Sequence, residues 1–334
     1  MKTIESQFDY ISDLCTGYWK SQVLIVAVEF EIFTKLYGSE KSIVSIARQI
    51  KADKRAMEML LNALAGLGFL SKKGDLFRNR QIADRFLVKG RPMYQGNRIL
   101  LFGNLWDNWG KLNRAVKTGG PVSFDNVGEE VDPARRRVFI SAMRDFAVLK
   151  SKEVAKCLDL SGCKLLLDLG GGPGSFAIEF VKLNPGLNAV VFDLEGVTAI
   201  TRDYINEAKL EKRISTINGE CLGGSYGKGL YDVVFVSNLM HMYDEKINIK
   251  IAKKCLAALK VNGRVIVHDF LLDNSMTAPE FAVLFSLNML TATHGGRNYS
   301  ASEITKWLQQ VGFGNLQRIN LSSGSGMIIG TKYK

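Results

Sequence analysis

The sequence predicts an α/β protein in which a mostly helical N-terminal domain precedes a doubly wound sheet. In residues 1–92, two short helical patterns and a hairpin pattern follow one another, which is typical of a winged helix. From residue 161 to residue 334, short aliphatic runs alternate with helical patterns, as in a parallel sheet with helices on both faces. We expect residues 93–160 to form a helical segment between these two domains.

The composition is that of a globular protein. Hydrophobic residues make up 46% of the 334 residues, and no apolar run approaches the roughly 20 residues of a membrane span. The first residues lack the layout of a signal peptide. The five cysteines are scattered without C-x-x-C spacing, which argues against a structural zinc site and favours reduced thiols. We therefore expect a soluble cytoplasmic protein that does not bind membranes.

The N-terminal domain is predicted from hydrophobic spacing and turn residues. Its expected elements are, in chain order, a helix over 24–36, helices over 42–50 and 53–65, and a hairpin of 66–70 and 76–78 with its turn at 72–75. Asp53 suits the N-cap of the third helix. Two helices followed by a hairpin predict a winged helix.

The second helix of the winged helix does not suit a reader of DNA bases. The net charge is +11, with an excess of eight positive charges in residues 1–150 and three in the remainder, but the basic residues are mostly dispersed. A helix in the major groove presents Arg, Asn, Gln or Ser to base edges. The outward positions of this helix are instead Glu58, Met59, Asn62 and Ala63. We expect no nucleic-acid partner and a dimerising or structural role.

Residues 93–160 combine helical patterns with aromatic side chains. Ile99–Trp109 is densely aromatic, and residues 138–146 form another apolar face. Such stripes more often pack in a core than contact a ligand, but Trp106 and Trp109, three positions apart, could form a wall for a flat substrate. A loop is expected over 118–128, followed by the acidic pair Glu129–Glu130.

A glycine-rich turn follows the short apolar run at 165–167, and a helical pattern resumes at Ser175. Residues 172–177 fit the dinucleotide fingerprint G-x-G-x-x-G/A. Residues 168–174 read as D-x-G-x-G-x-G, which resembles the first motif of class I S-adenosylmethionine (SAM) methyltransferases. A pyrophosphate would repel Asp168 at the end of the strand, whereas the ammonium group of SAM could pair with it. Asp193 would hold ribose hydroxyls in either case.

The alternation of strands and helices continues to the end of the chain. Strands are expected over 189–192, 214–217, 231–236 and 263–270, helices over 197–210 and 246–259, and a closing hairpin over 316–320 and 326–330. Ligands of such sheets lie at the carboxyl ends of the strands. His241 follows one of these strands by about one turn, and Asp269 ends the next.

An imidazole at this edge could take a proton from a hydroxyl, and a nearby carboxylate could orient it. A single histidine is more often a hydrogen-bonded structural residue. The position of His241 beside a cofactor loop, with Asp269 on a neighbouring strand, favours the catalytic interpretation.

The chain resembles the small-molecule O-methyltransferases of bacteria and plants, the family that includes acetylserotonin and caffeic acid methyltransferases. The resemblance runs from about residue 23 to the end. It is carried by the motifs at 168–174, 192–194, 239–245, 266–270, and 295–300 with 303–308. It implies a class I methyltransferase domain with SAM as cofactor, no metal, and a homodimer through the N-terminal domain in which helices of one subunit close the partner's pocket.

The resemblance also implies roles for individual residues. His241 would be the general base and Asp269 its orienting carboxylate. The implied cofactor contacts are Asp168, Gly170, Gly172, Gly174, Asp193, Leu194, Glu220, Cys221 and Ser237. The implied lining of the substrate pocket, besides Trp106, is Phe139, Met143, Phe146, Asn238, Asn288 and Met289. Plant members often have a lysine where Ser237 stands, and a second acid where Asn298 lies.

The expected function is therefore SAM-dependent methyl transfer to a hydroxyl of a small aromatic or heteroaromatic metabolite. A C- or N-methyltransferase on the same fold is the first alternative. An NAD-linked oxidoreductase and a winged-helix regulator that senses SAM are further alternatives, and neither explains His241 with Asp269. The identity of the acceptor is left open by the sequence.

Overall fold

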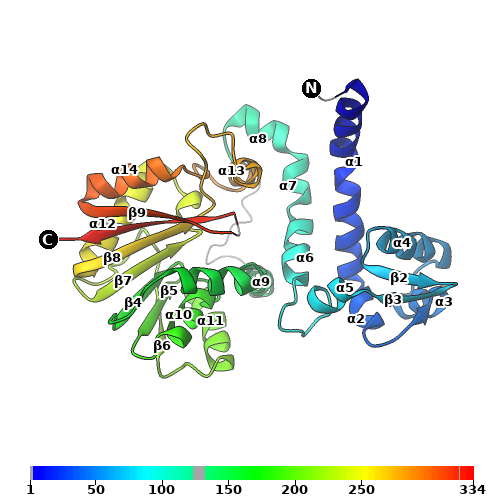
Figure 1. Cartoon of the computed structure of the whole chain (residues 1–334), viewed down its shortest axis with the longest axis horizontal. Helices are drawn as coiled ribbons and strands as arrows, with labels where there is room; N and C mark the ends of the chain where they lie inside the picture. The colour runs from blue at the N-terminus through cyan, green and yellow to red at the C-terminus, as the bar shows by residue number, and fades with distance from the viewer. Residues whose placement is uncertain (1–2, 123–131, 323) are drawn as a thin grey trace. The chain divides into compact units, whose positions relative to one another are not determined.

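The computed structural model describes residues 3–122, 132–322 and 324–334, and the chain forms two compact units, Met1–Leu105 and Trp106–Lys334 (Figure 1). The expected loop over 118–128 lies outside the described residues from position 123 on, as do Glu129 and Glu130. Within the described parts of the chain, no helix combines the length and the apolar character that crossing a bilayer requires.

The first unit consists of helices and a small antiparallel sheet with strand order β1-β3-β2. Its elements are α1 (Ile4–Glu29), α2 (Ile32–Leu36), β1 (Lys41–Ser42), α3 (Ile43–Ile50), α4 (Lys54–Gly66), β2 (Leu70–Lys73), β3 (Leu76–Asn79), α5 (Gln81–Phe86) and α6 (Gly96–Asn104). The expected winged helix corresponds to α3, α4 and the β2–β3 hairpin. Asp53 caps α4 as expected, since its carboxylate accepts the backbone N–H of Ala56 at 2.8 Å.

Two of the expected boundaries in this unit are wrong. The helix expected over 24–36 begins twenty residues earlier, at Ile4, and it is interrupted at Glu31, whose φ is +52°. The interruption allows α2 to bury Ile32 and Phe33 in the core of the unit, which a straight helix would not do. The strand expected from residue 66 begins only at Leu70, because Gly66 still belongs to α4.

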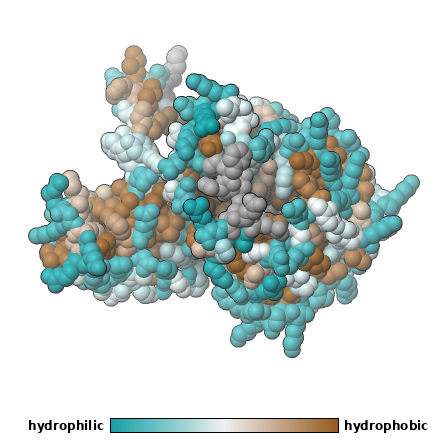
Figure 2. Space-filling model, turned by 180° about the vertical axis from the view of Figure 1, so that it is seen from behind, coloured by the Kyte–Doolittle hydropathy of each residue, from teal (hydrophilic) through white to brown (hydrophobic). Residues whose placement is uncertain are grey.

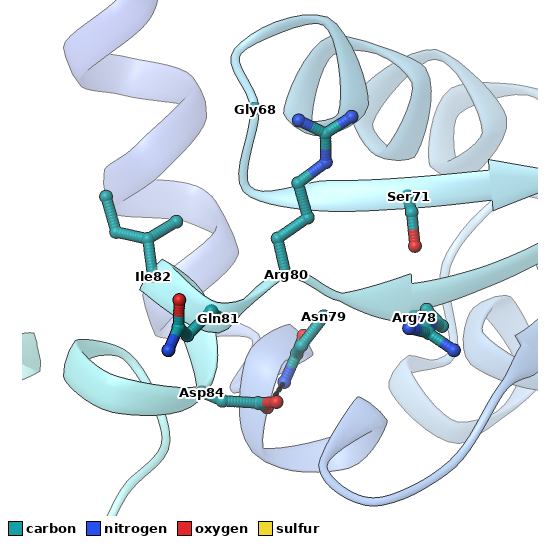
Figure 3. Close-up of a pocket in the computed structure, with 8 residues that line it drawn as sticks. All are labelled: Gly68, Ser71, Arg78, Asn79, Arg80, Gln81, Ile82 and Asp84. Carbon is teal, nitrogen blue, oxygen red and sulfur yellow. Dashed lines mark hydrogen bonds between the residues drawn. The ribbon is translucent and has the colours of Figure 1, made fainter.

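A hollow of about 650 Å³ lies beside the β2–β3 hairpin of this unit (Figure 3). Its lining is mostly polar and consists of Gly68, Ser71, Arg78, Asn79, Arg80, Gln81, Ile82 and Asp84. Asn79 donates from its side-chain amide to the carboxylate of Asp84 at 2.9 Å and to the backbone oxygen of Phe33 at 2.8 Å. The hollow belongs to the first unit, whereas every candidate site residue predicted above belongs to the second.

The second unit is a seven-stranded mixed sheet covered by helices on both faces. Its elements are α7 (Trp106–Gly110), α8 (Leu112–Thr118), α9 (Pro133–Cys157), β4 (Leu165–Leu169), α10 (Ser175–Leu183), β5 (Asn188–Asp193), α11 (Glu195–Glu207), β6 (Ile214–Asn218), β7 (Tyr231–Ser237), the 3₁₀ turn η1 (Met240–Met242), α12 (Glu245–Ala258), β8 (Leu259–Asp269), α13 (Glu280–Ala292), α14 (Ala301–Val311), β9 (Phe313–Asn320) and β10 (Gly326–Lys332).

The strand order β6-β5-β4-β7-β8-β10-β9 is that of a doubly wound sheet. The strands from β4 to β8 pair in parallel, and the closing hairpin of β9 and β10 pairs antiparallel with β8. The order of the strands reverses between β4 and β7, so their carboxyl ends form a crevice at the position where such sheets bind ligands. Residues that follow β4, β5, β7 and β8 therefore meet at one edge.

Helices cover both faces of this sheet, as Figure 1 shows with α9, α10 and α11 on one face and α12 and α14 on the other. The first face buries Phe176 and Phe180 of α10, and the second buries Trp307 of α14. Because both faces are buried, the central strands read as continuous aliphatic runs rather than as alternating patterns. Packing in the core thus determines the positions of the strand ends at which the candidate site residues lie.

Candidate active site

The glycine-rich turn connects the end of β4 to the start of α10. Gly170, Gly172 and Gly174 all have positive φ, between +52° and +71°, a conformation that glycine adopts without steric cost. The turn is anchored to β5, since Gly170 donates its N–H to the backbone oxygen of Phe192 at 2.8 Å. A Cβ atom at Gly172 would meet no atom within 4 Å, so backbone is exposed to a ligand there.

Asp168 lies beneath this turn and is completely buried. A Cβ atom added at Gly171 would lie 2.7 Å from its carboxyl carbon, which shows how closely the turn covers the side chain. Among the described residues, its two oxygens make no hydrogen bond of normal geometry, although the backbone N–H of Ala177 in α10 faces them. Burial raises the pKa of Asp168 to about 7, and the charge of Asp193 adds to this.

Asp193 ends β5 and connects it to the glycine turn. Its Oδ2 accepts the N–H of Gly172 at 2.8 Å, and its Oδ1 accepts the N–H of Leu194 at 2.8 Å. Burial raises the pKa of Asp193, while these two N–H groups oppose the rise. Each carboxylate oxygen retains a lone pair, so this side chain can still accept hydrogen bonds from ribose hydroxyls.

Glu220 and Cys221 follow β6 and lie close to Asp193. Burial raises the pKa of the Cys221 thiol to about 12, and the nearby charge of Asp193 contributes. Burial likewise raises the pKa of Tyr243 to about 12, with contributions from Cys221, Asp193 and Glu220. Tyr243 was not predicted as a site residue, although it stands two positions after His241 in the motif at 239–245. These mutual electrostatic contributions place the four side chains near one another, after the ends of β5, β6 and β7.

His241 and Asp269 form a buried pair at the ends of β7 and β8. The Nδ1 atom of His241 lies 2.7 Å from Oδ1 of Asp269, and both side chains are more than nine-tenths buried. The same oxygen accepts the N–H of Phe270 at 2.8 Å. Burial disfavours the charged carboxylate of Asp269. The electrostatic interaction and the hydrogen bond with His241, together with the N–H of Phe270, outweigh this effect, so the pKa of Asp269 lies below its usual range.

This pair fixes the role of each ring nitrogen of His241. Because an ionised carboxylate only accepts hydrogen bonds, Nδ1 carries the proton and Nε2 has the free lone pair. Within the part of the chain that the structure describes, Nε2 makes no hydrogen bond. The ring is packed in a T-shaped arrangement with Phe285 of α13, with 5.1 Å between the ring centroids and 79° between the planes. Phe285 was missed by the sequence analysis, although it shares a helix face with Asn288 and Met289.

The 3₁₀ turn that contains His241 is stabilised by side-chain hydrogen bonds to its backbone. The side-chain amide of Asn248 in α12, which is completely buried, donates to the backbone oxygens of Met240 at 2.9 Å and Tyr243 at 3.1 Å. The hydroxyl of Tyr299 also donates to the oxygen of Tyr243, at 2.6 Å. The backbone around the histidine is therefore held by three hydrogen bonds to its carbonyl groups.

The residues predicted to line a substrate pocket lie on three helices and one strand end. On α13, Asn288 accepts a hydrogen bond from the indole N–H of Trp109 in α7 at 3.0 Å, and Met289 is buried. On α9, Met143 and Phe146 are half-buried, while Phe139 packs on the Val197 and Ile200 cluster of α11. Trp106, on α7, is 43% exposed.

Ser237 and Asn238 stand where β7 ends. The hydroxyl of Ser237 is bonded to the side chains of His268, at 2.8 Å, and Asn238, at 3.1 Å. The Oδ1 atom of Asn238 is buried and makes no hydrogen bond to the described residues. The predicted cofactor contact at Ser237 thus has its hydroxyl engaged within the protein.

Comparison with protein families identifies the chain. A family model described as an O-methyltransferase domain matches residues 109–314, and another described as an O-methyltransferase dimerisation domain matches residues 12–89. The chain belongs to this O-methyltransferase family. The class I methyltransferase fold and the N-terminal helical dimerisation domain predicted from the sequence are thereby confirmed, and the enzyme is a SAM-dependent O-methyltransferase.

Individual relatives resemble this methyltransferase over nearly its whole length. The 3-hydroxy-5-methyl-1-naphthoate 3-O-methyltransferase of Streptomyces sahachiroi is 32% identical over 96% of this chain and 94% of its own. The tetracenomycin polyketide synthesis 8-O-methyl transferase of Streptomyces glaucescens is 28% identical over 96% of both. The structure of human N-acetylserotonin methyltransferase in complex with SAM has the same fold, with a TM-score of 0.91 at 24% identity and complete coverage of both chains.

The crevice of this methyltransferase fits SAM chemically. The exposed backbone at Gly172 can approach a ligand closely, and Asp193 can accept hydrogen bonds from ribose hydroxyls. Among the described residues, the carboxylate oxygens of the buried Asp168 make no hydrogen bond of normal geometry. A nearby cation such as SAM would therefore stabilise the charged form of Asp168. Asp168 is enclosed beneath the turn and is not exposed at its surface, so a ligand there would feel its charge across the turn.

Proposed function

We propose that this methyltransferase acts on a hydroxyl group of a small aromatic or heteroaromatic acceptor, with His241 as the general base. The observation that carries the proposal is the buried pair of His241 and Asp269 at the ends of adjacent strands, with Nε2 left without a partner among the described residues. This arrangement is that of a base whose second nitrogen is oriented by a carboxylate.

His241 accepts the proton of the acceptor hydroxyl on Nε2, and Asp269 stabilises the imidazolium that forms. Bound SAM supplies an activated methyl group. The 3₁₀ turn, held by Asn248 and Tyr299, keeps the imidazole in one place, so that little conformational freedom is lost when the acceptor binds. General base catalysis of this kind contributes about 10²–10⁴-fold to the rate.

An aromatic acceptor is supported by the rings around His241. Phe285 and the imidazole form a T-shaped pair, and Phe270 and Phe281 pack with Phe285 in one cluster. Trp109 is held by Asn288 on the same helix as Phe285. Two relatives are named for the methylation of a hydroxynaphthoate and of a polyketide, which are substrates of this general kind.

We also propose that the enzyme is a homodimer that acts in the cytoplasm. The match to a dimerisation domain over residues 12–89 supports the first statement. The stretch 4–19 of α1 carries large apolar side chains that are at least half exposed: Ile4, Phe8, Tyr10, Ile11, Leu14, Tyr18 and Trp19. Exposed apolar side chains show as brown atoms among the teal ones in the space-filling view of Figure 2. All five cysteines have free thiols, which suits a reducing compartment.

The test compares the wild-type enzyme with His241→Ala, using a panel of phenols, hydroxyindoles and hydroxynaphthoates with SAM. We expect at least a 10²-fold loss of turnover with SAM affinity unchanged by calorimetry. Product analysis by mass spectrometry and NMR places the methyl group on oxygen. Turnover by the variant close to that of the wild type excludes His241 as the base, and a product methylated on carbon or nitrogen excludes O-transfer to that acceptor.

A further inference from the structure

A chain of side-chain hydrogen bonds connects the end of β7, the end of β8 and the residue before β10, next to the Asp269 partner of the proposed base. His268 of β8 is completely buried, with its Nδ1 atom 2.8 Å from the hydroxyl of Ser237 at the end of β7. Its Nε2 atom lies 2.9 Å from the hydroxyl of Ser325, which precedes β10. The proposed function uses neither His268 nor Ser325, and a buried polar side chain in an otherwise aliphatic strand requires a reason.

The directions of these hydrogen bonds follow from the groups at the ends. Ser237 already accepts a hydrogen bond from the side-chain amide of Asn238 at 3.1 Å, so its own hydrogen is available for Nδ1 of His268. Burial lowers the pKa of His268 to about 4, and the imidazole is therefore neutral near pH 7. A neutral imidazole that accepts at Nδ1 donates at Nε2, and Ser325 is the acceptor there.

Packing holds the imidazole in this orientation. The ring of His268 stacks on Phe235 of β7, with 14° between the planes, and it contacts Phe176 of α10 at a centroid separation of 5.4 Å. Hydrogen bonds at both nitrogens and aromatic contacts leave a single orientation in which both polar atoms are satisfied. Ser237 is thereby connected to a rigid part of the sheet.

The two adjacent residues His268 and Asp269 form hydrogen bonds with the two ends of the segment 237–241. His268 holds Ser237 through its side chain and Asn238 through its backbone oxygen, which accepts the N–H of Asn238 at 2.9 Å. Asp269 holds His241. Between these anchors the chain turns sharply at Asn238, whose φ of +52° is uncommon for a residue with a side chain.

We infer that His268 is a positioning residue: through its Nδ1 contact with Ser237 it sets the conformation of the Ser237–His241 segment, and with it the placement of Asn238 and of the base at the acceptor. The inference rests on the proposed role of His241. It assigns the hydroxyl of Ser237 to this connection rather than to a contact with SAM. The Nε2 contact with Ser325 anchors the ring and has no direct part in positioning the segment.

Two substitutions of His268 distinguish the effect of losing the Nδ1 contact from the effect of losing the Nε2 contact. In His268→Asn, the side-chain amide lies near the place of Nδ1 and can still bond Ser237, whereas in His268→Gln it lies near the place of Nε2 and can bond Ser325. Both variants remove the aromatic ring, and His268→Asn leaves the larger void because its side chain is one methylene shorter, so packing loss alone would impair His268→Asn more than His268→Gln. Melting temperature, SAM affinity, and kcat and KM for the acceptor are measured for both.

We expect His268→Gln to lower kcat/KM for the acceptor by roughly five- to tenfold relative to His268→Asn, the size of effect that follows from one lost hydrogen bond. SAM affinities of the two variants should agree with each other, and the melting temperature of His268→Asn should be no higher than that of His268→Gln. In Ser237→Ala, the difference between Asn and Gln at position 268 should disappear, because the partner of Nδ1 is absent.

Equal kcat/KM values for the two variants overturn the inference and leave His268 a structural residue. A lower kcat/KM for His268→Asn than for His268→Gln also overturns it. The hypothesis that His241 is the base is tested separately: it is wrong if His241→Ala retains its turnover. A His241→Ala variant without turnover, together with equal Asn and Gln variants, contradicts only the role of His268.

Discussion

The Nδ1 atom of His241 lies 2.7 Å from the Oδ1 atom of Asp269, although 28 residues separate them in the chain. The contact forms because β7 and β8 pair in parallel, with Ser237 opposite His268, so that the residues following one strand meet the end of the other. Asp269 then fixes which nitrogen of His241 carries the proton. The pair depends on strand register, and a shift by one residue would turn Asp269 to the opposite face of the sheet.

Replacement of Asp269 by Asn tests the electrostatic part of this pair. The amide can still accept the Nδ1–H through its oxygen, but it lacks the charge that stabilises the imidazolium, so we expect kcat to fall by about 10²-fold. Steady-state kinetics with the best acceptor measures the effect, and SAM affinity serves as the control. A kcat within twofold of the wild-type value would show that the carboxylate only shapes the site.

Binding of SAM should depend on pH through Asp168. Burial raises the pKa of this carboxyl to about 7, and a bound cation would lower it again, so binding requires the release of a proton below pH 7. We expect SAM affinity to weaken by up to about tenfold between pH 8 and pH 6. Asp193, whose pKa burial also raises, contributes with the same sign.

The variant Asp168→Asn distinguishes the contribution of Asp168 to the pH dependence of SAM binding from that of Asp193. Its SAM affinity should be lower than that of the wild type at pH 8 and should vary less with pH, as calorimetry in buffers of different ionisation enthalpy can measure. An identical pH dependence in the variant and the wild type would assign the effect to Asp193 alone.

Two neighbouring glycines of the turn should respond differently to alanine. At Gly171 the added Cβ atom would lie 2.7 Å from the Asp168 carboxyl and 2.8 Å from Cγ1 of Val191, so Gly171→Ala should lower the free energy of unfolding by about 1–3 kcal/mol. At Gly172 the added atom meets open space, and the backbone strain costs about 1 kcal/mol.

Gly172→Ala should instead weaken SAM binding, because its methyl group occupies space at the surface of the turn. Urea unfolding without SAM and calorimetric titration with SAM measure the two effects independently. A larger loss of stability in Gly172→Ala than in Gly171→Ala would contradict the close packing of Asp168 beneath the turn.

Protein stability should decrease with acid through His268. Burial lowers its pKa from 6.5 to about 4; Asp269 and Glu153 oppose the shift, and Lys150 adds to it. The unfolded chain therefore binds a proton between pH 6.5 and pH 4 that the folded chain does not, and the free energy of unfolding falls by about 3 kcal/mol over this range. In His268→Asn this contribution is absent, so urea unfolding at pH 7 and pH 4.5 should show a smaller difference than in the wild type.

The apolar side of α1 should determine the oligomeric state. Leu14 is 64% exposed and lies among the apolar side chains that we propose to be covered in a homodimer. Leu14→Glu places a charge there and should shift the dimer towards monomer in light-scattering measurements. Lys20→Glu, on the opposite side of α1 at 100° per residue, is the matched control. A monomeric wild-type enzyme would exclude the proposed interface.

Much of the second unit could be predicted from local sequence. The aliphatic run before Asp168 and the glycines after it predict a strand and a tight turn, because a short aliphatic run that ends at glycines is typical of a strand buried on both faces. The helices of the first unit were placed less well. The pattern at 24–36 indicates one helix, whereas the structure divides it at Glu31 so that Ile32 and Phe33 can reach the core. Tertiary packing overrides local periodicity there.

The sequence by itself determined which groups are available: an acid before a glycine turn, a histidine after one strand and a carboxylate at the end of another. Only the tertiary structure decided which atoms meet. It placed Nδ1 of His241 on Asp269, enclosed Asp168 beneath Gly171, and connected His268 to Ser237. The physical reason is that these contacts join residues distant in sequence, and their distances follow from strand register and helix packing, which no local pattern of residues encodes.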